Sequence, residues 1–510
     1  MIARLICGSL HGVDAYRVDL EVDFSRHGIP AFVMVGLAEG AVREARDRVF
    51  SALRASGFKL PPARITVNLA PADRRKAGSA YDLALAVGLL AAGGIIAAER
   101  AEGWVLAGEL SLNGEIRSVP GILPLALLAR AEKAKGMLVA PEAGDEAAVV
   151  EGLTVYTPRT LGEAAAFLAG ETELLPHICK VSRHETAYSG DFSEVRGQEH
   201  AKRAIEIAAA GAHNLLLIGP PGSGKTMLAR RIPSVLPPLS FEEALEVTKI
   251  YSVAGLLGNR GLMTERPFRA PHHTVSDVAL IGGGTIPRPG EVCLAHRGVL
   301  FLDELPEFRR SALEVLRQPL EDGMVTIARV AHALTFPADC MLVAAMNPCP
   351  CGYRGDPRHD CTCSPSARER YRARLSGPLL DRIDLHVEVP SVPREELQTP
   401  AARRAGMDSA SMRERVARAR ALQTERYAGT PCRANSGLSG ALLDRYCALD
   451  AECGEFLGLA ADRLGLSARA YTRILRIART IADLEESPSI RLPHLAEAVN
   501  CRVLDRERLS

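Results

Sequence analysis

The first third of the chain alternates between two patterns of apolar residues. Residues 16–22 and 64–69 carry apolar side chains at roughly every second position, which is typical of strands with one buried face. Residues 39–56 repeat apolar positions at helical spacing, and residues 83–92 form an almost continuous apolar segment of helical length. These elements predict a mixed α/β domain over residues 1–172.

A polar stretch over residues 173–190 contains proline, serine and glycine and predicts a linker. Beyond it, the runs at 214–218, 298–302 and 340–346 are continuously apolar, as in strands that are buried on both faces of a parallel sheet. We therefore predict a second α/β domain with a parallel sheet over residues 191–392.

The last part of the chain, residues 393–510, follows a proline-rich boundary and has a helical, arginine-rich pattern. Residues 466–484 carry apolar side chains at helical spacing. Arg473, Arg476 and Arg479 recur every three residues, and we expect them to form a solvated or interface face rather than a site. This part is predicted to be a helical lid.

Composition adds few constraints to this picture. The 510 residues carry a net charge of +1, so a nucleic-acid surface would have to be local. The first residues lack a long apolar core, and the run at 83–98 is too short to span a bilayer. We expect a cytoplasmic protein with no membrane partner, whose twelve cysteines are reduced thiols apart from one cluster.

Candidate chemistry starts with a glycine-rich loop between an apolar run and a helix-like segment. In a phosphate-binding loop, glycines let backbone N–H groups and the helix N-terminus face the phosphates. Lys225 would contact the β- and γ-phosphates, and the Thr226 hydroxyl would ligate Mg²⁺. The sequence therefore predicts a nucleoside triphosphate site. Its eight residues are Gly219, Pro220, Pro221, Gly222, Ser223, Gly224, Lys225 and Thr226.

Two later strands end in polar residues that suit phosphate chemistry. Asp303 and Glu304 follow the run at 298–302, at the edge of the sheet where the phosphate loop lies. Asp303 would hold Mg²⁺ through water, and Glu304 would polarise the attacking water. Asn347 follows the next strand and fits a sensor of the γ-phosphate; a capped turn is the alternative.

Three further segments resemble parts of AAA+ ATPases. Val195, Gly197 and Gln198 lie in a stretch that is similar to the adenine-side box, which favours ATP as the nucleotide. Arg382 stands where related ATPases place an arginine finger, and Arg469 stands where the lid helix bears a second sensor. A finger acts on a neighbouring subunit's ATP, so it implies a ring. For Arg382 the alternative is an intrachain salt bridge to one of its flanking aspartates.

Two insertions in the second domain would face the channel of such a ring. Residues 267–284 form an irregular loop in which His272 and its histidine neighbour should point apart, so a shared metal ion is not expected. Residues 322–337 resemble the hairpin insertion of helicase-type AAA+ proteins. We expect Arg269, His272 and Arg329 to contact the phosphates of single-stranded and branched DNA, with weak sequence preference.

Four cysteines form two Cys-x-Cys pairs in a short polar loop. Cys349, Cys351, Cys361 and Cys363 have the donor number of a structural zinc site, although their spacing departs from the usual Cys-x-x-Cys. Reduced thiols without metal are the alternative, and His359 is a substitute ligand.

The N-terminal region resembles the proteolytic domain of Lon in its element order and in a Gly-Glu-Leu-Ser-x-x-Gly-x-Ile run. Lon hydrolysis needs a serine nucleophile and a lysine base. In this chain the serine position falls on Ala80 and the lysine position on about Leu125, so we expect no protease activity. Ser79 and Lys76 are an alternative, displaced dyad; the simpler interpretation is a loop residue and a solvated cation.

These motifs, with Asn-Pro-Cys-Pro-Cys-Gly-Tyr and the helix that ends in Ala-Arg-Thr-Ile-Ala-Asp-Leu, make the chain similar to the YifB/ComM family of magnesium-chelatase-like AAA+ proteins. The resemblance implies an ATP-dependent DNA helicase that forms a homo-hexamer and promotes branch migration when transforming DNA is integrated. It implies ATP and Mg²⁺ as cofactors. A chelatase motor and a protein-remodelling ATPase are the competing functions.

Overall fold

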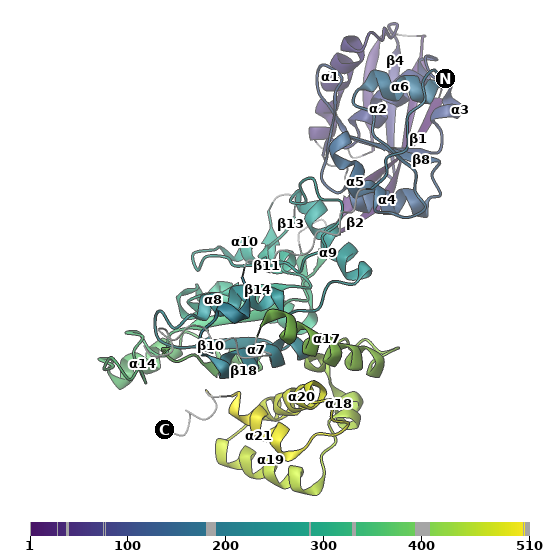
Figure 1. Cartoon of the computed structure of the whole chain (residues 1–510). Helices are drawn as coiled ribbons and strands as arrows, with labels where there is room; N and C mark the ends of the chain where they lie inside the picture. Colours follow the sequence, from purple (N-terminus) through teal and green to yellow (C-terminus); the bar gives the residue numbers. More distant parts are fainter. Residues whose placement is uncertain are drawn as a thin grey trace. The chain divides into compact units, whose positions relative to one another are not determined.

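The computed structural model describes residues 2–27, 29–36, 40–74, 76, 78–179, 190–284, 287–328, 333–392, 408–502 and 504. These residues form two compact units, shown in Figure 1. The N-terminal unit contains Met1–His184 and Phe241–Thr264, and the C-terminal unit contains Glu185–Ser240 and Glu265–Ser510.

The N-terminal unit is built on a seven-stranded mixed sheet with the order β3-β4-β2-β1-β5-β8-β9. β2 runs antiparallel to both of its neighbours, and the remaining neighbours are parallel. A separate antiparallel pair is formed by β6 and β7, and Asn113 and Gly114 lie between these two strands. The strands are β1 (Ile2–His11), β2 (Asp14–Ser25), β3 (Ala31–Val35), β4 (Arg64–Ala70), β5 (Trp104–Ala107), β6 (Glu109–Leu110), β7 (Ile116–Arg117), β8 (Gly136–Val139) and β9 (Val155–Tyr156).

Two apolar clusters cover the two faces of this sheet, because side chains alternate along each strand. Four helices contribute to one cluster: α1 (Gly40–Ala55), α2 (Asp82–Ala92), α3 (Ala98–Ala101) and α6 (Leu161–Ala169). The other cluster is formed with α4 (Ile122–Ala131) and α5 (Gly144–Ala148). Every residue of α2 is buried, so its small side chains let the helix pack tightly in the core.

The helix α9 (Phe241–Ala254) also belongs to the N-terminal unit, although it lies inside the range 191–392 that the sequence assigns to the second domain. Its residues Val247 and Ile250 are buried. The backbone N–H of Gly121 donates to the carbonyl of Ser252 over 3.0 Å, and Lys249 pairs with Asp14 at 2.8 Å. The helix packs against α4 and is hydrogen-bonded to the N-terminal unit, and its local sequence pattern does not reveal these long-range contacts.

The C-terminal unit contains a five-stranded, wholly parallel sheet with the order β11-β14-β17-β10-β18. All residues of β10, β14 and β17 are buried, which confirms the three strands predicted from continuous apolar runs. The strands are β10 (Leu215–Ile218), β11 (Phe268–Arg269), β14 (Val299–Leu302), β17 (Met341–Met346) and β18 (Leu385–Glu388).

Two hairpins interrupt this unit, and the second confirms the hairpin predicted just before the sensor strand. They are β12 (Gly282–Gly283) with β13 (Arg288–Pro289), and β15 (Met324–Ala328) with β16 (Ala333–Pro337). The helices of this part are α7 (Glu199–Gly211), α8 (Lys225–Arg231), α10 (Asp277–Ile281), α11 (Glu291–Leu294), α12 (Arg310–Val315), α13 (Arg317–Asp322), α14 (Pro365–Arg372) and α15 (Gly377–Leu380).

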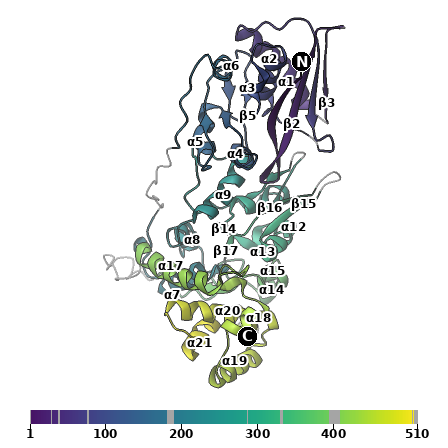
Figure 2. The same cartoon turned by 90° about the vertical axis from the view of Figure 1, so that its right-hand side faces the viewer.

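The C-terminal helices start with α17 (Ser409–Arg426), and four more gather in one group in Figure 2. They are α18 (Gly440–Tyr446), α19 (Ala451–Leu464), α20 (Ala468–Leu484) and α21 (Leu492–Asn500).

The arginines of α20 were expected to form a solvated or interface face, and the solvated form of this prediction is wrong. Arg479 is 2% exposed and pairs with the buried Asp483 at 2.9 Å, and Arg473 pairs with Asp384 at 3.2 Å. Arg476 donates to a backbone carbonyl. Arg473 and Arg479 are buried because they pair with buried aspartates. The spacing of residues along the helix does not reveal such partners.

Among the helices that the structure describes, none is long and apolar enough to span a bilayer.

Candidate active site

The glycine-rich loop joins β10 to α8 at the carboxyl edge of the parallel sheet. A Cβ atom on Gly219 would lie 2.1 Å from the Val389 carbonyl oxygen, so only glycine fits there. Gly222 and Gly224 have φ values of +76° and +91°, in the left-handed region that favours glycine. The buried Ser223 hydroxyl has no hydrogen-bond partner among the described residues. An open polar loop of this kind is suited to bind phosphate.

Lys225 lies at the centre of this loop and is 8% exposed. Its Nζ donates to the carbonyl oxygens of Gly219 at 2.7 Å and Pro220 at 2.9 Å, and to Asn347 Oδ1 at 3.3 Å. Burial lowers the pKa of Lys225 to about 8, and the acidic pair Asp303 and Glu304 partly offsets this effect. The ammonium group thus joins the loop to the predicted sensor residue.

The predicted Mg²⁺ ligands lie next to each other. The Thr226 hydroxyl donates to Asp303 Oδ2 over 2.7 Å, and Asp303 Oδ1 accepts the backbone N–H of Glu304 at 3.0 Å. A hydroxyl and a carboxylate at this separation suit a hard divalent cation that keeps several waters, as Mg²⁺ does. When bound, Mg²⁺ would neutralise charge on the phosphates. Glu304 has a φ of +53°, an uncommon backbone conformation for a residue with a side chain.

The predicted adenine-side residues precede α7. Val195 is buried in the core, and Gly197 and Gln198 have positive φ values of 60° and 59°. The Gln198 side chain donates to the carbonyls of Pro390 at 2.5 Å and Ser223 at 3.4 Å. This segment therefore lies beside the phosphate loop and is tied to it.

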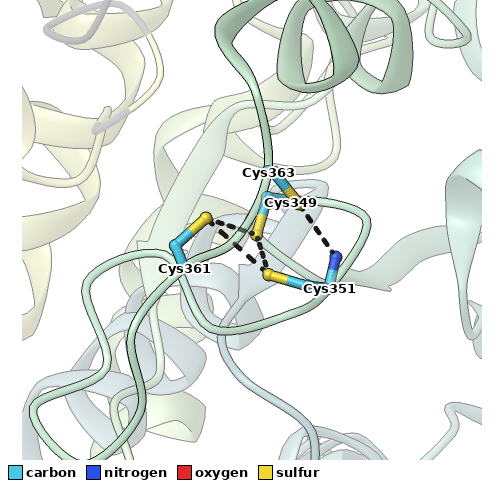
Figure 3. A group of neighbouring side chains, drawn as sticks. All are labelled: Cys349, Cys351, Cys361 and Cys363. Carbon is cyan, nitrogen blue, oxygen red and sulfur yellow. Dashed lines mark hydrogen bonds between the residues drawn. The ribbon is translucent and has the colours of Figure 1, made fainter.

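The four predicted cysteine ligands converge, as Figure 3 shows. Sγ of Cys349 lies 3.4 Å from that of Cys351 and 3.6 Å from that of Cys361, and the latter two are 3.7 Å apart. Cys363 Sγ accepts the backbone N–H of Cys351 at 3.3 Å, and all four sulfurs lie within 4.8 Å of one another. His359 is not part of this group.

The cysteine cluster fits a tetrahedral zinc ion, in which Zn–S bonds of about 2.3 Å separate sulfurs by about 3.8 Å. The pKa values within the cluster shift in opposite directions: a backbone hydrogen bond from Tyr353 is the main cause that lowers the pKa of Cys351 to about 6, whereas burial raises the pKa of Cys349. The four cysteines would hold the ion and give it a structural, closed coordination shell.

The cluster leads directly into α14, which lines a pocket of about 590 Å³ beside the catalytic edge. Arg370 and Arg374 face this pocket together with Glu304 and Asn347. Arg374 also pairs with Glu307 at 2.8 Å. Neither arginine was predicted as a site residue; the only signal in the sequence is a helix pattern that follows immediately after the last cysteine.

The two remaining ATP-related arginines do not contact the phosphate loop. Arg382 is held by Glu321 at 2.6 Å and by the Pro378 carbonyl at 2.7 Å, so its intrachain partner is neither of the flanking aspartates considered as alternatives. Arg469 is 64% exposed and lies 3.9 Å from Asp381. Their predicted roles remain predictions.

The three predicted DNA contacts have different surroundings. Arg269 forms a bidentate salt bridge with Glu291, with distances of 2.6 and 2.8 Å. The carboxylate neutralises part of the positive charge that Arg269 would offer to a phosphate. His272 is exposed, and its Nδ1 lies 2.9 Å from the Thr274 hydroxyl. Arg329 lies outside the described residues.

The second histidine of the pair, His273, was not predicted as a site residue. The rings of His272 and His273 have centroids 4.1 Å apart, so the expectation that they point apart is wrong, because the segment turns instead of extending. His273 Nδ1 lies 3.4 Å from Glu304 Oε2. Sequence alone could not find this contact, since 31 residues separate the two.

In the N-terminal unit, the two positions that the resemblance to Lon assigns to the dyad, Ala80 and Leu125, carry apolar side chains. Leu125 is buried in the cluster to which Ala80 also contributes. The Lys76 amine is buried and donates to the Pro71 carbonyl, so it is not the solvated cation of the simpler interpretation. This geometry supports a structural role.

Three family profiles match the chain. Magnesium chelatase, subunit ChlI matches residues 191–397, subunit ChlI of Mg-chelatase matches residues 20–143, and the ChlI C-terminal family matches residues 406–502. Together with the phosphate loop and the parallel sheet, they place the chain among magnesium-chelatase-like AAA+ proteins, which implies an ATPase that uses ATP and Mg²⁺.

Relatives that match over nearly the full length show which family within the magnesium-chelatase-like AAA+ proteins the chain belongs to. The chain is 46% identical to competence protein ComM of Haemophilus influenzae, over 97% of this chain and 96% of that protein. It is 44% identical to the uncharacterized protein YifB of Escherichia coli, over the same shares. Lon protease 2 of Bacillus subtilis is 28% identical over 26% of each chain. The chain belongs to the YifB/ComM family.

Proposed function

We propose that the chain is an ATP-driven DNA motor that acts as a homo-hexameric ring and promotes branch migration during the integration of transforming DNA. The observation that carries this proposal is the convergence of the phosphate loop, Thr226 and Asp303 at one sheet edge of a domain that also contains two hairpins. The similarity to a protein named for competence favours DNA as the substrate.

ATP hydrolysis follows from the convergence of groups at one sheet edge. The phosphate loop and Lys225 would hold the phosphates, while Thr226 and Asp303 would hold Mg²⁺. Glu304 would polarise water, and Asn347, already bonded to Lys225, would sense the γ-phosphate. Each of these residues follows a strand of the same parallel sheet or starts the helix after it.

The resemblance to AAA+ ATPases, in which an arginine finger acts across subunits, supports a ring with Arg382 as the finger. The Arg382 Nε atom is buried without a hydrogen-bond partner among the described residues, and one guanidinium edge is held by Glu321. An arginine finger works on the ATP of the adjacent subunit, and release from Glu321 would let Arg382 reach it. The hairpin of β15 and β16 and the exposed His272 would then contact the DNA backbone.

A second function, remodelling of a protein partner, is favoured by the N-terminal unit. This unit retains two well-packed sheet faces but carries apolar side chains at the Lon dyad positions. A folded domain that lacks the serine and lysine needed for hydrolysis can instead serve to bind a protein partner. The same ATPase would then act on a protein, as in a chelatase motor.

The ATPase rate with and without single-stranded and branched DNA separates the two functions, provided that oligomer mass is measured under the same conditions. The DNA motor predicts a rate increase of about tenfold or more together with a ring-sized species. A constant rate without a DNA-bound ring contradicts it and favours the protein partner.

A further inference from the structure

The contact between His273 and Glu304 joins two elements that are neighbours in the sheet. β11 pairs in parallel with β14, with Phe268 opposite Val299 and Arg269 opposite Leu300. His273 follows Arg269 by four residues, as Glu304 follows Leu300. The register therefore brings both side chains to the same edge, where Nδ1 and Oε2 are 3.4 Å apart.

The His273 ring is fixed by aromatic neighbours. It packs against the ring of His272 at 4.1 Å and meets Phe308 edge-to-face at 6.4 Å, with an interplanar angle of 76°. Phe308 is 5% exposed and thus anchored in the core. A side chain held in this way can fix the orientation of its neighbour.

Glu304 needs such support. Its side chain is 59% exposed, and its backbone has a φ of +53°. A carboxylate that polarises water must be held in one orientation relative to the γ-phosphate, because small displacements of a reacting group reduce the rate strongly. The described contacts of Asp303 fix the turn but not the Glu304 carboxylate.

We propose that His273 is a positioning residue that orients the Glu304 carboxylate toward the attacking water during ATP hydrolysis. The proposal rests on the role of Glu304 in hydrolysis but not on DNA as the substrate. His272 does not share this role, since its Nδ1 faces the Thr274 hydroxyl. His273 acts through Glu304 and does not itself touch the nucleotide.

The test is basal ATP turnover without DNA in His273→Ala and His273→Gln, with ATP affinity measured by a fluorescent nucleotide. We expect kcat of His273→Ala to fall by about tenfold or more, with KM and nucleotide affinity within about twofold of the parent. His273→Gln should recover part of kcat, because its amide can donate to the carboxylate. Leu459→Ala, an exposed change in α19 of the same unit, should leave kcat unchanged.

A double-mutant cycle with Glu304→Gln, read by single-turnover hydrolysis, separates positioning from a general structural role. If His273 acts through Glu304, adding His273→Ala to Glu304→Gln causes no further loss. An equal loss in both backgrounds, a parallel loss of nucleotide affinity, or an unchanged or raised kcat in His273→Ala would overturn the proposal. These assays contain no DNA. They therefore test the role of His273 even if the protein proves not to be a DNA motor.

Discussion

Lys76 in the N-terminal unit and Lys225 in the C-terminal unit are both buried, and their surroundings differ. Lys76 in the N-terminal unit donates to one backbone carbonyl, and Lys225 in the C-terminal unit donates to two carbonyls and Asn347. Burial lowers the pKa of both. Only Lys225 has acidic, hydroxyl and amide groups from several strands around it. A buried charge alone therefore does not make a site; convergence at a sheet edge does.

The largest expected difference between the units comes from removing these lysines. Lys225→Ala should weaken ATP binding by about 100-fold or more, because the phosphates lose their cation. Lys76→Met should leave ATP binding unchanged while it alters the stability of the N-terminal unit. Fluorescent-nucleotide titration checks both, and equal losses in the two variants would remove the distinction.

Glu304→Gln tests the chemistry at the same edge. Since the amide cannot polarise water as the carboxylate does, kcat should fall by about 100-fold while ATP still binds. Steady-state turnover and nucleotide titration on one preparation measure this. Normal turnover would exclude Glu304 from the mechanism.

Arg382→Ala tests whether ATP hydrolysis needs an arginine from a neighbouring subunit of the ring. We expect ATP affinity to be retained and hydrolysis in the assembled ring to fall by about tenfold to 100-fold. Glu321→Gln is the matched control, because it removes the intrachain partner of Arg382 but keeps the guanidinium group. Full activity of Arg382→Ala at a concentration that gives rings would refute the arginine finger.

The cysteine cluster should affect the C-terminal unit by a smaller amount. Protein purified under reducing conditions should contain one zinc per chain. Cys361→Ser should lower the zinc content. It should also lower kcat by about threefold, because α14 and its arginines follow the cluster and line the pocket beside Glu304. Cys432→Ser, a cysteine outside the cluster, is the control. Absence of zinc from the parent protein would contradict the metal site.

The smallest effect is expected in the N-terminal unit, at Glu146. Burial raises the pKa of this carboxyl, and hydrogen bonds from Ser252 and the Leu123 N–H partly offset the shift. Between the ordinary pKa and the raised one, the folded state binds more protons, so stability falls as pH rises through that interval. Glu146→Gln should remove this loss, so its stability relative to the parent should be higher at pH 7.5 than at pH 4.5.

Urea unfolding followed by fluorescence checks this change, because the single tryptophan, Trp104, reports on the N-terminal unit. Ser252→Ala is the complementary variant: it removes a partner of Glu146 and should destabilise the unit at both pH values. A stability difference between Glu146→Gln and the parent that does not change with pH would contradict the raised pKa.

The sequence predicts those elements that are determined by residues close to one another in the chain. Continuous apolar runs gave β10, β14 and β17, and the loop motif placed Lys225 and Thr226 at the start of α8. Contacts over long sequence distances were not predictable. Asp384 pairs with the buried Arg473, Glu321 pairs with Arg382, and α9 packs against α4 of the N-terminal unit, and the partners of each pair lie far apart in the sequence.

The central claim, an ATP-driven motor on branched DNA, is tested most directly by branch migration of a labelled three-strand junction. The account predicts ATP-dependent strand exchange by the parent protein, and none by Glu304→Gln, which still binds ATP and DNA. Exchange that proceeds equally with Glu304→Gln, or no exchange by a parent protein that hydrolyses ATP and binds the junction, would contradict it.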